Sequence, residues 1–314
     1  MSELRFDEQA AIVTGAGNGL GRSHALLLAS RGAMVVVNDL GGAVDGSGAD
    51  TTAAQQVVDE ITAAGGIAVA NTDSVATPEG GESIVQTALD AFGRIDIVVN
   101  NAGILRDKAF HNQTVETIDA VLDVHLRGAF YVTLPAYRYM REHGYGRIVV
   151  TASPAGLFGN FGQTNYSAAK MGLVGFARAI GQEGGRKGVH ANVISPTAAT
   201  RMTEGLLGTL SEDTDPEYIS AAVAYLCHES CELQGEVLAA AAGRVARCFV
   251  GVTPGYMNRE LTPEDVADNL DTIMAEDGYT VPTGVGDEMK LIAQALKDNP
   301  ALSLIHISEP TRQL

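Results

Sequence analysis

A tyrosine and a lysine stand four residues apart in the segment YSAAK, as Tyr166 and Lys170. On a helix this spacing places both side chains on one face. A free phenol has a pKa of about 10 and is a weak base at neutral pH, but a neighbouring ammonium group favours the phenolate. Ser153 lies thirteen residues before Tyr166, just after a predicted strand, where its hydroxyl can hold a substrate oxygen. The three residues are therefore predicted to remove a proton from a substrate hydroxyl.

A glycine-rich turn lies near the start of the chain, in the segment TGAGNGLG at residues 14–21. It follows a predicted strand and opens a predicted helix, which is the setting that a dinucleotide fingerprint requires. Glycine has no Cβ, so a pyrophosphate can approach the backbone at the helix N-terminus. The spacing is not G-x-G-x-x-G, because Leu20 occupies the sixth position. The turn is still predicted to bind a dinucleotide through Gly15, Asn18, Gly19, Leu20 and Gly21.

An aspartate, Asp39, ends the second predicted strand. An acid at this position, about twenty residues beyond the turn, binds the ribose hydroxyls of the adenosine half. Its neighbours Asn38 and Leu40 are not basic, so nothing nearby would neutralise a 2′-phosphate. The cofactor is therefore predicted to be NAD and not NADP. The alternative is an aspartate on a surface loop with no ligand.

The elements that position these residues alternate along the chain. Short apolar runs followed by helical patterns predict βαβ units, and so an α/β fold: a Rossmann-type doubly wound parallel sheet of about seven strands with helices on both faces. The expected strands are 10–13, 33–38, 67–70, 95–99, 147–151, 189–194 and 238–243. The expected helices are 20–30, 55–64, 79–92, 114–143, 164–184 and 216–229.

Three segments of the chain are predicted to differ in kind. Residues 1–250 are predicted to form the dinucleotide-binding domain. Residues 251–301 are predicted to form a helical extension, whose sequence is acidic and interrupted by prolines, as in LTPEDVADNLDTIM. Residues 302–314 contain LSLIHISEPTR, which matches codon by codon the translation of a transposase sequencing adapter. We expect this segment not to be native. The alternative is a genuine amphipathic tail.

Composition and charge limit the classes of partner. The chain of 314 residues has a formal net charge of −17, which argues against nucleic acid, because a binder needs surplus Lys and Arg. An anionic substrate must then be met by a local basic patch. No apolar run is long enough to span a bilayer. Charges occupy the N-terminus where a signal peptide would be apolar, so the protein is predicted to be cytoplasmic, without a membrane partner.

Two cysteines flank a histidine in LCHESC, as Cys227, His228 and Cys231. This spacing suggests a metal site, but no second cluster of ligands exists elsewhere in the sequence. An amphipathic helix with two buried thiols is the preferred interpretation, and no metal is expected.

Taken together, the turn, the NNAG segment at residues 100–103, Ser153 and YSAAK resemble the short-chain dehydrogenase/reductase family over roughly residues 7–245. The resemblance implies a catalytic tetrad of Asn, Ser, Tyr and Lys. His125, in DVHLRGAF, stands at the Asn position. In the family that residue acts largely through its backbone carbonyl, which holds a water in the proton relay to the lysine, and a histidine can supply the same carbonyl. The alternative for His125 is a packed helix histidine.

The same resemblance implies further contacts to the cofactor and a homodimer. The dimer would form through the helices expected at 114–143 and 164–184. The expected further cofactor contacts are Asp73, Ser74, Val75, Asn101, Ala102, Gly103, Tyr166, Lys170, Pro196 and Thr200.

Several longer segments are similar to one branch of the family, the (3R)-hydroxyacyl-CoA dehydrogenases of fatty-acid β-oxidation and their bacterial relatives, in which His replaces the helix Asn. They are NDLGG, NNAGILRD, VHLRGAF, GNFGQTNYSAAK, RMTE, LCHESC and LTPEDV. The resemblance implies oxidation of (3R)-3-hydroxyacyl-CoA to 3-oxoacyl-CoA.

Two alternatives remain beside this reaction. One is a 17β-hydroxysteroid or other secondary-alcohol dehydrogenase, and the other is a non-catalytic dinucleotide sensor, which the intact Ser153, Tyr166 and Lys170 oppose. For an acyl-CoA substrate, Arg106, Lys108 and Arg201 flank the predicted pocket and could meet the phosphates of CoA. Each of these three is also interpretable as a solvated surface charge.

Overall fold

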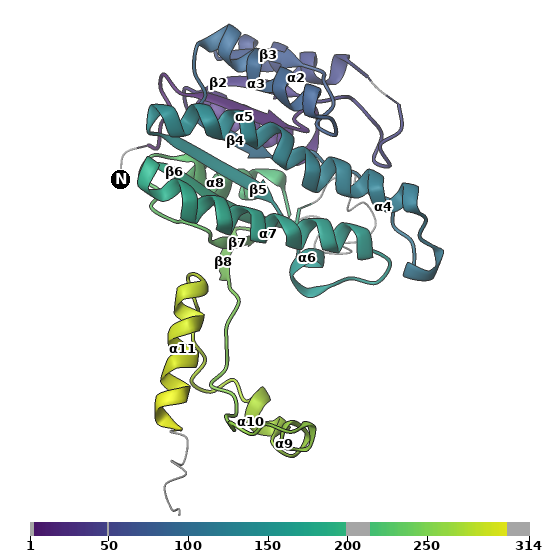
Figure 1. Ribbon diagram of the computed structural model, residues 1–314. Helices are drawn as coiled ribbons and strands as arrows, with labels where there is room; N and C mark the ends of the chain where they lie inside the picture. The colour runs from purple at the N-terminus through teal and green to yellow at the C-terminus, as the bar shows by residue number, and fades with distance from the viewer. Residues whose placement is uncertain (1–2, 49, 199–213, 300–314) are drawn as a thin grey trace, which may run out of the picture. The chain divides into compact units, whose positions relative to one another are not determined.

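The computed structural model describes residues 3–48, 50–198 and 214–299. The chain divides into two compact units, Met1–Cys248 and Phe249–Leu314, which are coloured purple to green and green to yellow in Figure 1. The expected cofactor contact Thr200, the candidate Arg201 and the segment 302–314 lie outside the described residues.

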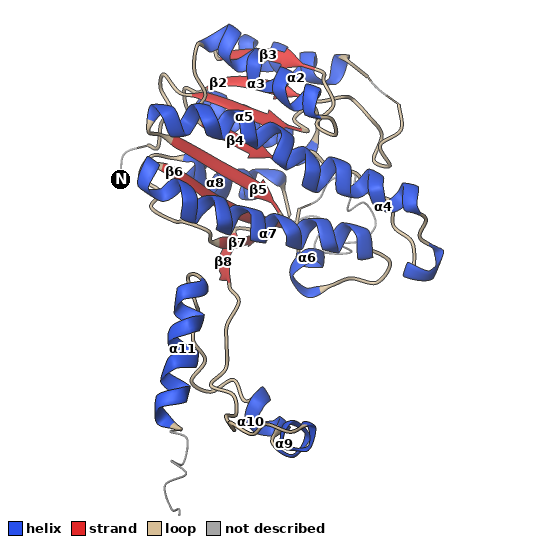
Figure 2. Cartoon of the chain, in the orientation of Figure 1, coloured by secondary structure: helices blue, strands red, loops and turns tan. Residues whose placement is uncertain are grey.

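The first unit is built on an eight-stranded sheet with the order β3-β2-β1-β4-β5-β6-β7-β8. Figure 2 shows the strands in red between the helices. All neighbouring pairs are parallel except β7 and β8. The strand order reverses between β1 and β4, which is where open α/β sheets bind ligands at the carboxyl ends of their strands. The strands are β1 (Ala10–Thr14), β2 (Met34–Asn38), β3 (Ile67–Asn71), β4 (Ile97–Asn100), β5 (Gly146–Thr151), β6 (Val189–Pro196), β7 (Val237–Ala241) and β8 (Arg244–Cys248).

Helices cover both faces of this sheet. Side chains alternate along each strand: Val13 of β1 packs with α1, α2 and α8, whereas Ile12 packs with α3, α5 and α7. Every residue of β1 and β5 is buried, as a strand covered on both faces requires. The helices are α1 (Gly19–Ser30), α2 (Thr52–Ala63), α3 (Pro78–Phe92), α4 (Val115–Leu122), α5 (Gly128–His143), α6 (Pro154–Phe158), α7 (Thr164–Gly184) and α8 (Pro216–Cys227).

This architecture confirms the predicted fold class, with one strand more than the expected seven. The additional strand is β8, which pairs antiparallel with β7. A two-residue turn joins them, with positive φ at Ala242 (47°) and Gly243 (74°). Such turns usually carry Asn-Gly or Asp-Gly, so the Ala-Gly pair provided no signal for a hairpin.

A second difference lies in the long helix expected over residues 114–143. The chain does form helix there, but a π-helical turn, Asp123–Arg127, separates α4 from α5. Thr114 caps α4 in a capping box with Thr117. A π-turn inserts an extra residue into the helical ladder and is frequent at functional sites. It carries His125, which is the family-implied tetrad residue.

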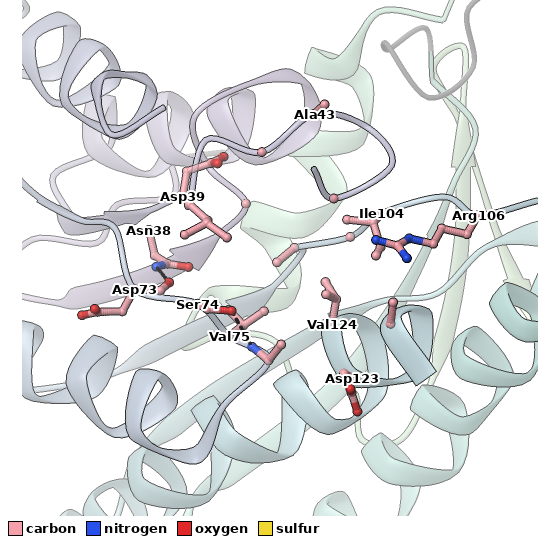
Figure 3. A pocket seen from close by; sticks show the side chains of 18 residues that line it. Asn38, Asp39, Ala43, Asp73, Ser74, Val75, Ile104, Arg106, Asp123 and Val124 are labelled. Atoms are coloured by element: carbon pink, nitrogen blue, oxygen red, sulfur yellow. Dashed lines mark hydrogen bonds between the residues drawn. The ribbon is translucent and has the colours of Figure 1, made fainter. Parts of the chain in front are cut away.

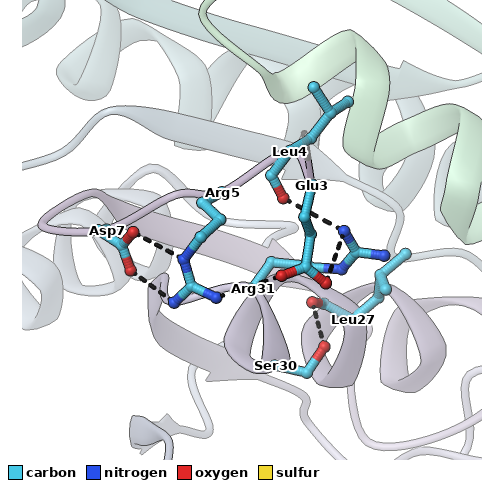
Figure 4. A network of polar contacts seen from close by, with 7 residues as sticks. All are labelled: Glu3, Leu4, Arg5, Asp7, Leu27, Ser30 and Arg31. Carbon is cyan, nitrogen blue, oxygen red and sulfur yellow. Dashed lines mark hydrogen bonds and ion pairs between the residues drawn. The ribbon is translucent and has the colours of Figure 1, made fainter. Parts of the chain in front are cut away.

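The segment before β1 is joined to the end of α1 by polar contacts (Figure 4). Arg31 lies 3.1 Å from a Glu3 carboxylate oxygen and donates to the Leu4 carbonyl at 3.4 Å. These groups are partly or fully exposed, so the ion pair is worth only about 0–1 kcal/mol. The Phe6 side chain is buried, and its backbone nitrogen donates to the carbonyl of Arg31 at 2.8 Å, so both contacts also hold this segment in place.

The second unit contains α9 (Pro263–Asp268), α10 (Leu270–Met274) and α11 (Val285–Asp298). A β-bridge between Val252 and Thr280 joins two of its loops. None of these three helices contains a buried residue. Among the described residues of the whole chain, no helix combines the length and the apolar character needed to cross a bilayer.

Candidate active site

Three predicted catalytic side chains meet beside the carboxyl end of β5. Ser153 follows this strand and caps α6, and its hydroxyl is also hydrogen-bonded to the Tyr166 phenol. Tyr166 and Lys170 lie on the first turns of α7, with the Lys170 ammonium 5.5 Å from the centre of the tyrosine ring. Lys170 donates to the carbonyl of Thr151 at 2.5 Å. A strand end and a helix thus bring together residues that are thirteen positions apart in sequence.

Burial dominates the electrostatics of this group. It raises the pKa of the Tyr166 phenol above its ordinary value, and the hydrogen bond from Ser153 works in the opposite direction. Burial also lowers the pKa of Lys170 to about 7. Lys170 therefore gives up its proton more readily than a free lysine.

His125 is a buried residue that contacts the site through its imidazole ring. Its Nε2 lies 3.0 Å from the backbone nitrogen of Ile104 and 2.8 Å from the carbonyl oxygen of the same residue. Burial and the charge of Lys170 hold the pKa of His125 well below its ordinary value, so the ring is neutral. The ring nitrogen can accept from the N–H or donate to the carbonyl, but not both at once.

The ring of His125 requires a glycine beneath it. A Cβ added to Gly103 would lie 2.4 Å from the imidazole Cε1, so a larger residue would displace the ring. His125 lines a small cavity of about 10 Å³ together with Thr14, Asn100 and Lys170. This is about the space that one water needs. The relay through the His125 carbonyl, implied by the family, stays a prediction.

A larger cavity of about 300 Å³ lies at the carboxyl ends of β1 to β4 (Figure 3). It brings together seven of the predicted cofactor contacts from the four loops that follow β1, β2, β3 and β4. The glycine turn can adopt its path only without side chains: Gly15 has φ +63°, and a Cβ on Gly21 would lie 2.1 Å from the Gly15 carbonyl oxygen. The seven predicted residues are Gly15, Asp39, Asp73, Ser74, Val75, Ala102 and Gly103.

Asp39 is held at one end of this cavity by two backbone amides. One carboxylate oxygen accepts from Gly17 and the other from Gly41, each at 2.7 Å. A carboxylate oxygen has a further lone pair, so both remain able to accept a ribose hydroxyl. The acid, the glycine turn and the N-terminus of α1 together fit a dinucleotide, and a 2′-phosphate would meet the negative charge of Asp39.

The other predicted cofactor contacts lie around the cavity in different ways. Asn101 donates from its side chain to the carbonyls of Thr14 and Gly15, at 3.0 and 3.1 Å, so it supports the turn from behind. Asn18 and Gly19 are exposed and Leu20 is half-buried at the start of α1, and Pro196 ends β6.

Two amide side chains next to the tyrosine were not predicted from the sequence. Asn165 is only 4% exposed and donates to the carbonyl of Thr117 at 3.0 Å, with a longer bond of 3.3 Å to the carbonyl of Arg106. Gln163 donates to the carboxylate of Asp107 at 2.7 Å. These bonds tie the start of α7 to α4 through Thr117 and to the loop after β4 through Arg106 and Asp107. The only signal was the pair of amides in the segment QTNY that precedes the lysine motif.

The candidate CoA-binding cations have different surroundings. Arg106 lines the large cavity together with Asp39 and Ala43. Lys108 is exposed, and its backbone nitrogen donates to the carbonyl of Gly162.

Far along the chain, Cys227 and Cys231 are buried free thiols, as the sequence predicted. The described part of the chain holds no group of three or more His, Cys, Asp or Glu arranged for a metal ion.

Comparison with known proteins places this geometry in a family. The family profile described as short chain dehydrogenase matches residues 9–208, more than half of the chain. The chain belongs to the short-chain dehydrogenase family. This membership confirms the resemblance found in the sequence motifs.

Three members of the family illustrate its similarities. Mouse peroxisomal multifunctional enzyme type 2 is 47% identical over 94% of this chain. A hydroxyacyl-CoA dehydrogenase of Mycobacterium tuberculosis is 38% identical over 82% of this chain and 83% of its own length. The structure of full-length peroxisomal multifunctional enzyme type 2 from Drosophila melanogaster matches with a TM-score of 0.80 and 39% identity over 94% of this chain. The chain spans 40% of the mouse protein and 50% of the Drosophila chain.

Proposed function

We propose that this protein is an NAD-dependent dehydrogenase that oxidises (3R)-3-hydroxyacyl-CoA to 3-oxoacyl-CoA. The observation that carries the proposal is the group formed by Ser153, Tyr166 and Lys170 next to a cavity with an acid at its ribose end. The similarity to a hydroxyacyl-CoA dehydrogenase and to peroxisomal multifunctional enzymes supports the substrate class.

In the proposed reaction the substrate hydroxyl lies between Ser153 and Tyr166. A nicotinamide ring held beside these residues would supply the acceptor for the hydride of the carbinol carbon. Ser153 holds the substrate oxygen, and Tyr166 takes the hydroxyl proton, so that a carbonyl remains. Lys170 and the water-sized cavity beside it provide a path by which the proton leaves the phenol. Asn165 and Gln163 act as positioning residues for Tyr166, because they fix the start of its helix.

The choice of NAD over NADP is part of the proposal, and Asp39 supports it. Among the described residues that line the cavity, Arg106 is the only cation, and its Nε is bonded to the carbonyl of Asp45 and not to a group near Asp39. A 2′-phosphate would therefore meet Asp39 with no basic partner beside it.

We further propose a homodimer formed through α5 and α7, as the family resemblance implies. Phe130 and Leu134 on α5 are 49% and 51% exposed, and Met171 on α7 is 40% exposed. Exposed apolar side chains on adjacent helices support such an interface. Light scattering on the purified chain tests the dimeric state.

The predicted cytoplasmic location stays a prediction, and the mouse and Drosophila relatives carry peroxisomal names.

A substrate panel with NAD tests the proposed reaction. NADH absorbance is followed with (3R)- and (3S)-hydroxyacyl-CoAs of several lengths, 17β-hydroxysteroids and simple polyols. We expect the 3R thioester to be oxidised at least ~100-fold more efficiently than the 3S form, a difference of about 2.7 kcal/mol in transition-state binding. Equal kcat/KM for both enantiomers, or activity on steroids alone, would contradict the acyl-CoA substrate. No activity on any alcohol, with NADH still bound, would favour a dinucleotide sensor.

A further inference from the structure

A loop segment crosses the cofactor cavity between β2 and α2. We call residues 40–48, which follow Asp39, the strap. The carbonyl of Val44 accepts from the backbone nitrogen of Leu105 at 2.9 Å, and the carbonyl of Asp45 accepts from the Nε of Arg106 at 3.0 Å. A Cβ on Gly46 would lie 3.1 Å from the Ile104 side chain, so the two segments are in close contact. The strap therefore links the acid end of the cavity to the loop after β4.

The bond to the strap fixes the guanidinium of Arg106. Figure 3 shows this group beside Ile104 at the edge of the cavity. Its Nε is used by the Asp45 carbonyl, whereas neither outer nitrogen, Nη1 or Nη2, donates to a protein group among the described residues. An arginine held at Nε with its two outer nitrogens open presents a planar pair of donors to an anion.

The charged side chains that line the cavity are mainly negative, so a bound anion needs a positive group such as the Arg106 guanidinium. Asp39, Asp73 and Asp123 line it, and Arg106 is the only cation among its described lining residues. A dinucleotide carries two negative charges on its pyrophosphate, and burying them without compensation is costly. The N-terminus of α1 supplies a partial positive charge, and among the described residues that line this cavity Arg106 alone supplies a full one.

We propose that Arg106 binds the pyrophosphate of the dinucleotide and that the strap holds the guanidinium in place for this contact. The inference rests on the proposed use of a dinucleotide cofactor. It assigns Arg106 to the cofactor, whereas the sequence had suggested the phosphates of CoA.

The test is binding of NADH to the full chain, measured by fluorescence titration and calorimetry without substrate. Arg106→Met should weaken NADH binding by about 10- to 100-fold, because a charge-assisted contact to a buried phosphate is lost. Arg106→Lys should recover part of the affinity, since it keeps the charge but not the paired donors. Lys187→Met is the matched control: it removes an exposed cation just before β6, at the amino ends of the strands, and should leave the NADH affinity unchanged.

A second variant tests the strap. Gly46 has φ +83°, and its neighbour Ile104 leaves little room, so Gly46→Val should displace the strap. NADH affinity should then fall although Arg106 is intact, and thermal unfolding of each variant shows whether the fold is preserved. An unchanged NADH affinity in a folded Gly46→Val protein would overturn the role of the strap.

Substrate kinetics at saturating NAD separate the two possible anions. Arg106→Met should have the same effect on a hydroxyacyl-CoA as on the matching N-acetylcysteamine thioester, which has no phosphates. A selective rise in KM for the CoA substrate, with NADH binding within about twofold of the wild type, would overturn the inference. That outcome leaves the proposed reaction intact. Wild-type protein that binds no NADH would instead refute the cofactor assignment on which the inference rests.

Discussion

The imidazole ring of His125 stands edge-on to the phenol ring of Tyr166, with ring centres 5.1 Å apart and an interplanar angle of 89°. This contact joins the π-turn between α4 and α5 to the start of α7. Nε2 of His125 also contacts the backbone of Ile104. One side chain therefore holds the position of both the Tyr166 ring and the loop after β4. His125 is therefore a positioning residue in this structure, whatever its carbonyl contributes.

His125→Asn should retain most of the activity, because an amide can donate to the Ile104 carbonyl and accept from its N–H at the same time. His125→Phe should remove the one hydrogen bond that the ring nitrogen makes to the Ile104 backbone and destabilise the fold by about 1–3 kcal/mol. It should also lower kcat more than it raises KM. Urea unfolding and steady-state kinetics measure the two effects, and equal activity of the Phe and Asn variants would contradict the positioning role.

Replacing the proposed base gives the most direct test of the reaction. Tyr166→Phe removes the proton acceptor but keeps the ring that packs against His125, so the fold should persist. We expect kcat to fall by at least about 10²-fold with little change in NADH affinity. Activity within a few-fold of the wild type would show that Tyr166 is not the base.

The rate of alcohol oxidation should rise with pH. Only the phenolate of Tyr166 can accept the substrate proton, and burial raises the pKa of this phenol, so the active form increases on the alkaline side. Ser153→Ala removes the hydrogen bond that lowers this pKa. The variant should therefore reach its maximal kcat at a higher pH than the wild type, and its kcat should be lower. Measured kcat from pH 6 to 10 that falls as pH rises would contradict the assignment.

Acid should destabilise the protein through His24, a buried residue of α1. Burial lowers its pKa to about 3, and its Nδ1 lies 2.8 Å from the Ser220 hydroxyl. A depressed pKa in the folded state stabilises it above the unfolded pKa of about 6.5, and this contribution is lost as pH falls towards 3. At pH 4.5 the loss is about 2–3 kcal/mol from this group. The buried His125 acts in the same direction.

Unfolding by urea at pH 7 and pH 4.5 measures this effect. His24→Gln should reduce the difference in unfolding free energy between the two pH values. His143→Gln, at an exposed position, is the matched control. The assignment of acid sensitivity to His24 fails when both variants lose the same stability as the wild type on acidification.

Cofactor selectivity should follow Asp39. Asp39→Ala removes both a ribose acceptor and a charge that repels a 2′-phosphate, so NAD use should weaken and the preference over NADP should narrow. The variant also frees the amides of Gly17 and Gly41, which the carboxylate now binds. Kd values for NADH and NADPH measure the change. A wild type that already prefers NADPH would contradict the proposal for NAD.

Some features of this protein could be predicted because their signals are local in the chain. The four-residue spacing of Tyr166 and Lys170 depends only on the period of a helix. The apolar runs that became β1, β2, β4, β5 and β6 reflect burial on both faces of the sheet. The glycine turn was also predictable, because its glycines fit only a backbone path without side chains. The hairpin to β8 and the π-turn at Asp123–Arg127 were not, since neither carries a distinctive residue pattern.

Other features depend on segments that are far apart in sequence. Arg106 faces the cofactor cavity because the strap, some sixty residues earlier, binds its Nε. Asn165 acts on Tyr166 through the carbonyls of Thr117 and Arg106. The lowered pKa of Lys170 follows from the burial of its ammonium in the folded protein. Spacing and composition predict which groups react, but desolvation and long-range hydrogen bonds exist only after the chain has folded, so only the tertiary structure decides how those groups are charged and held.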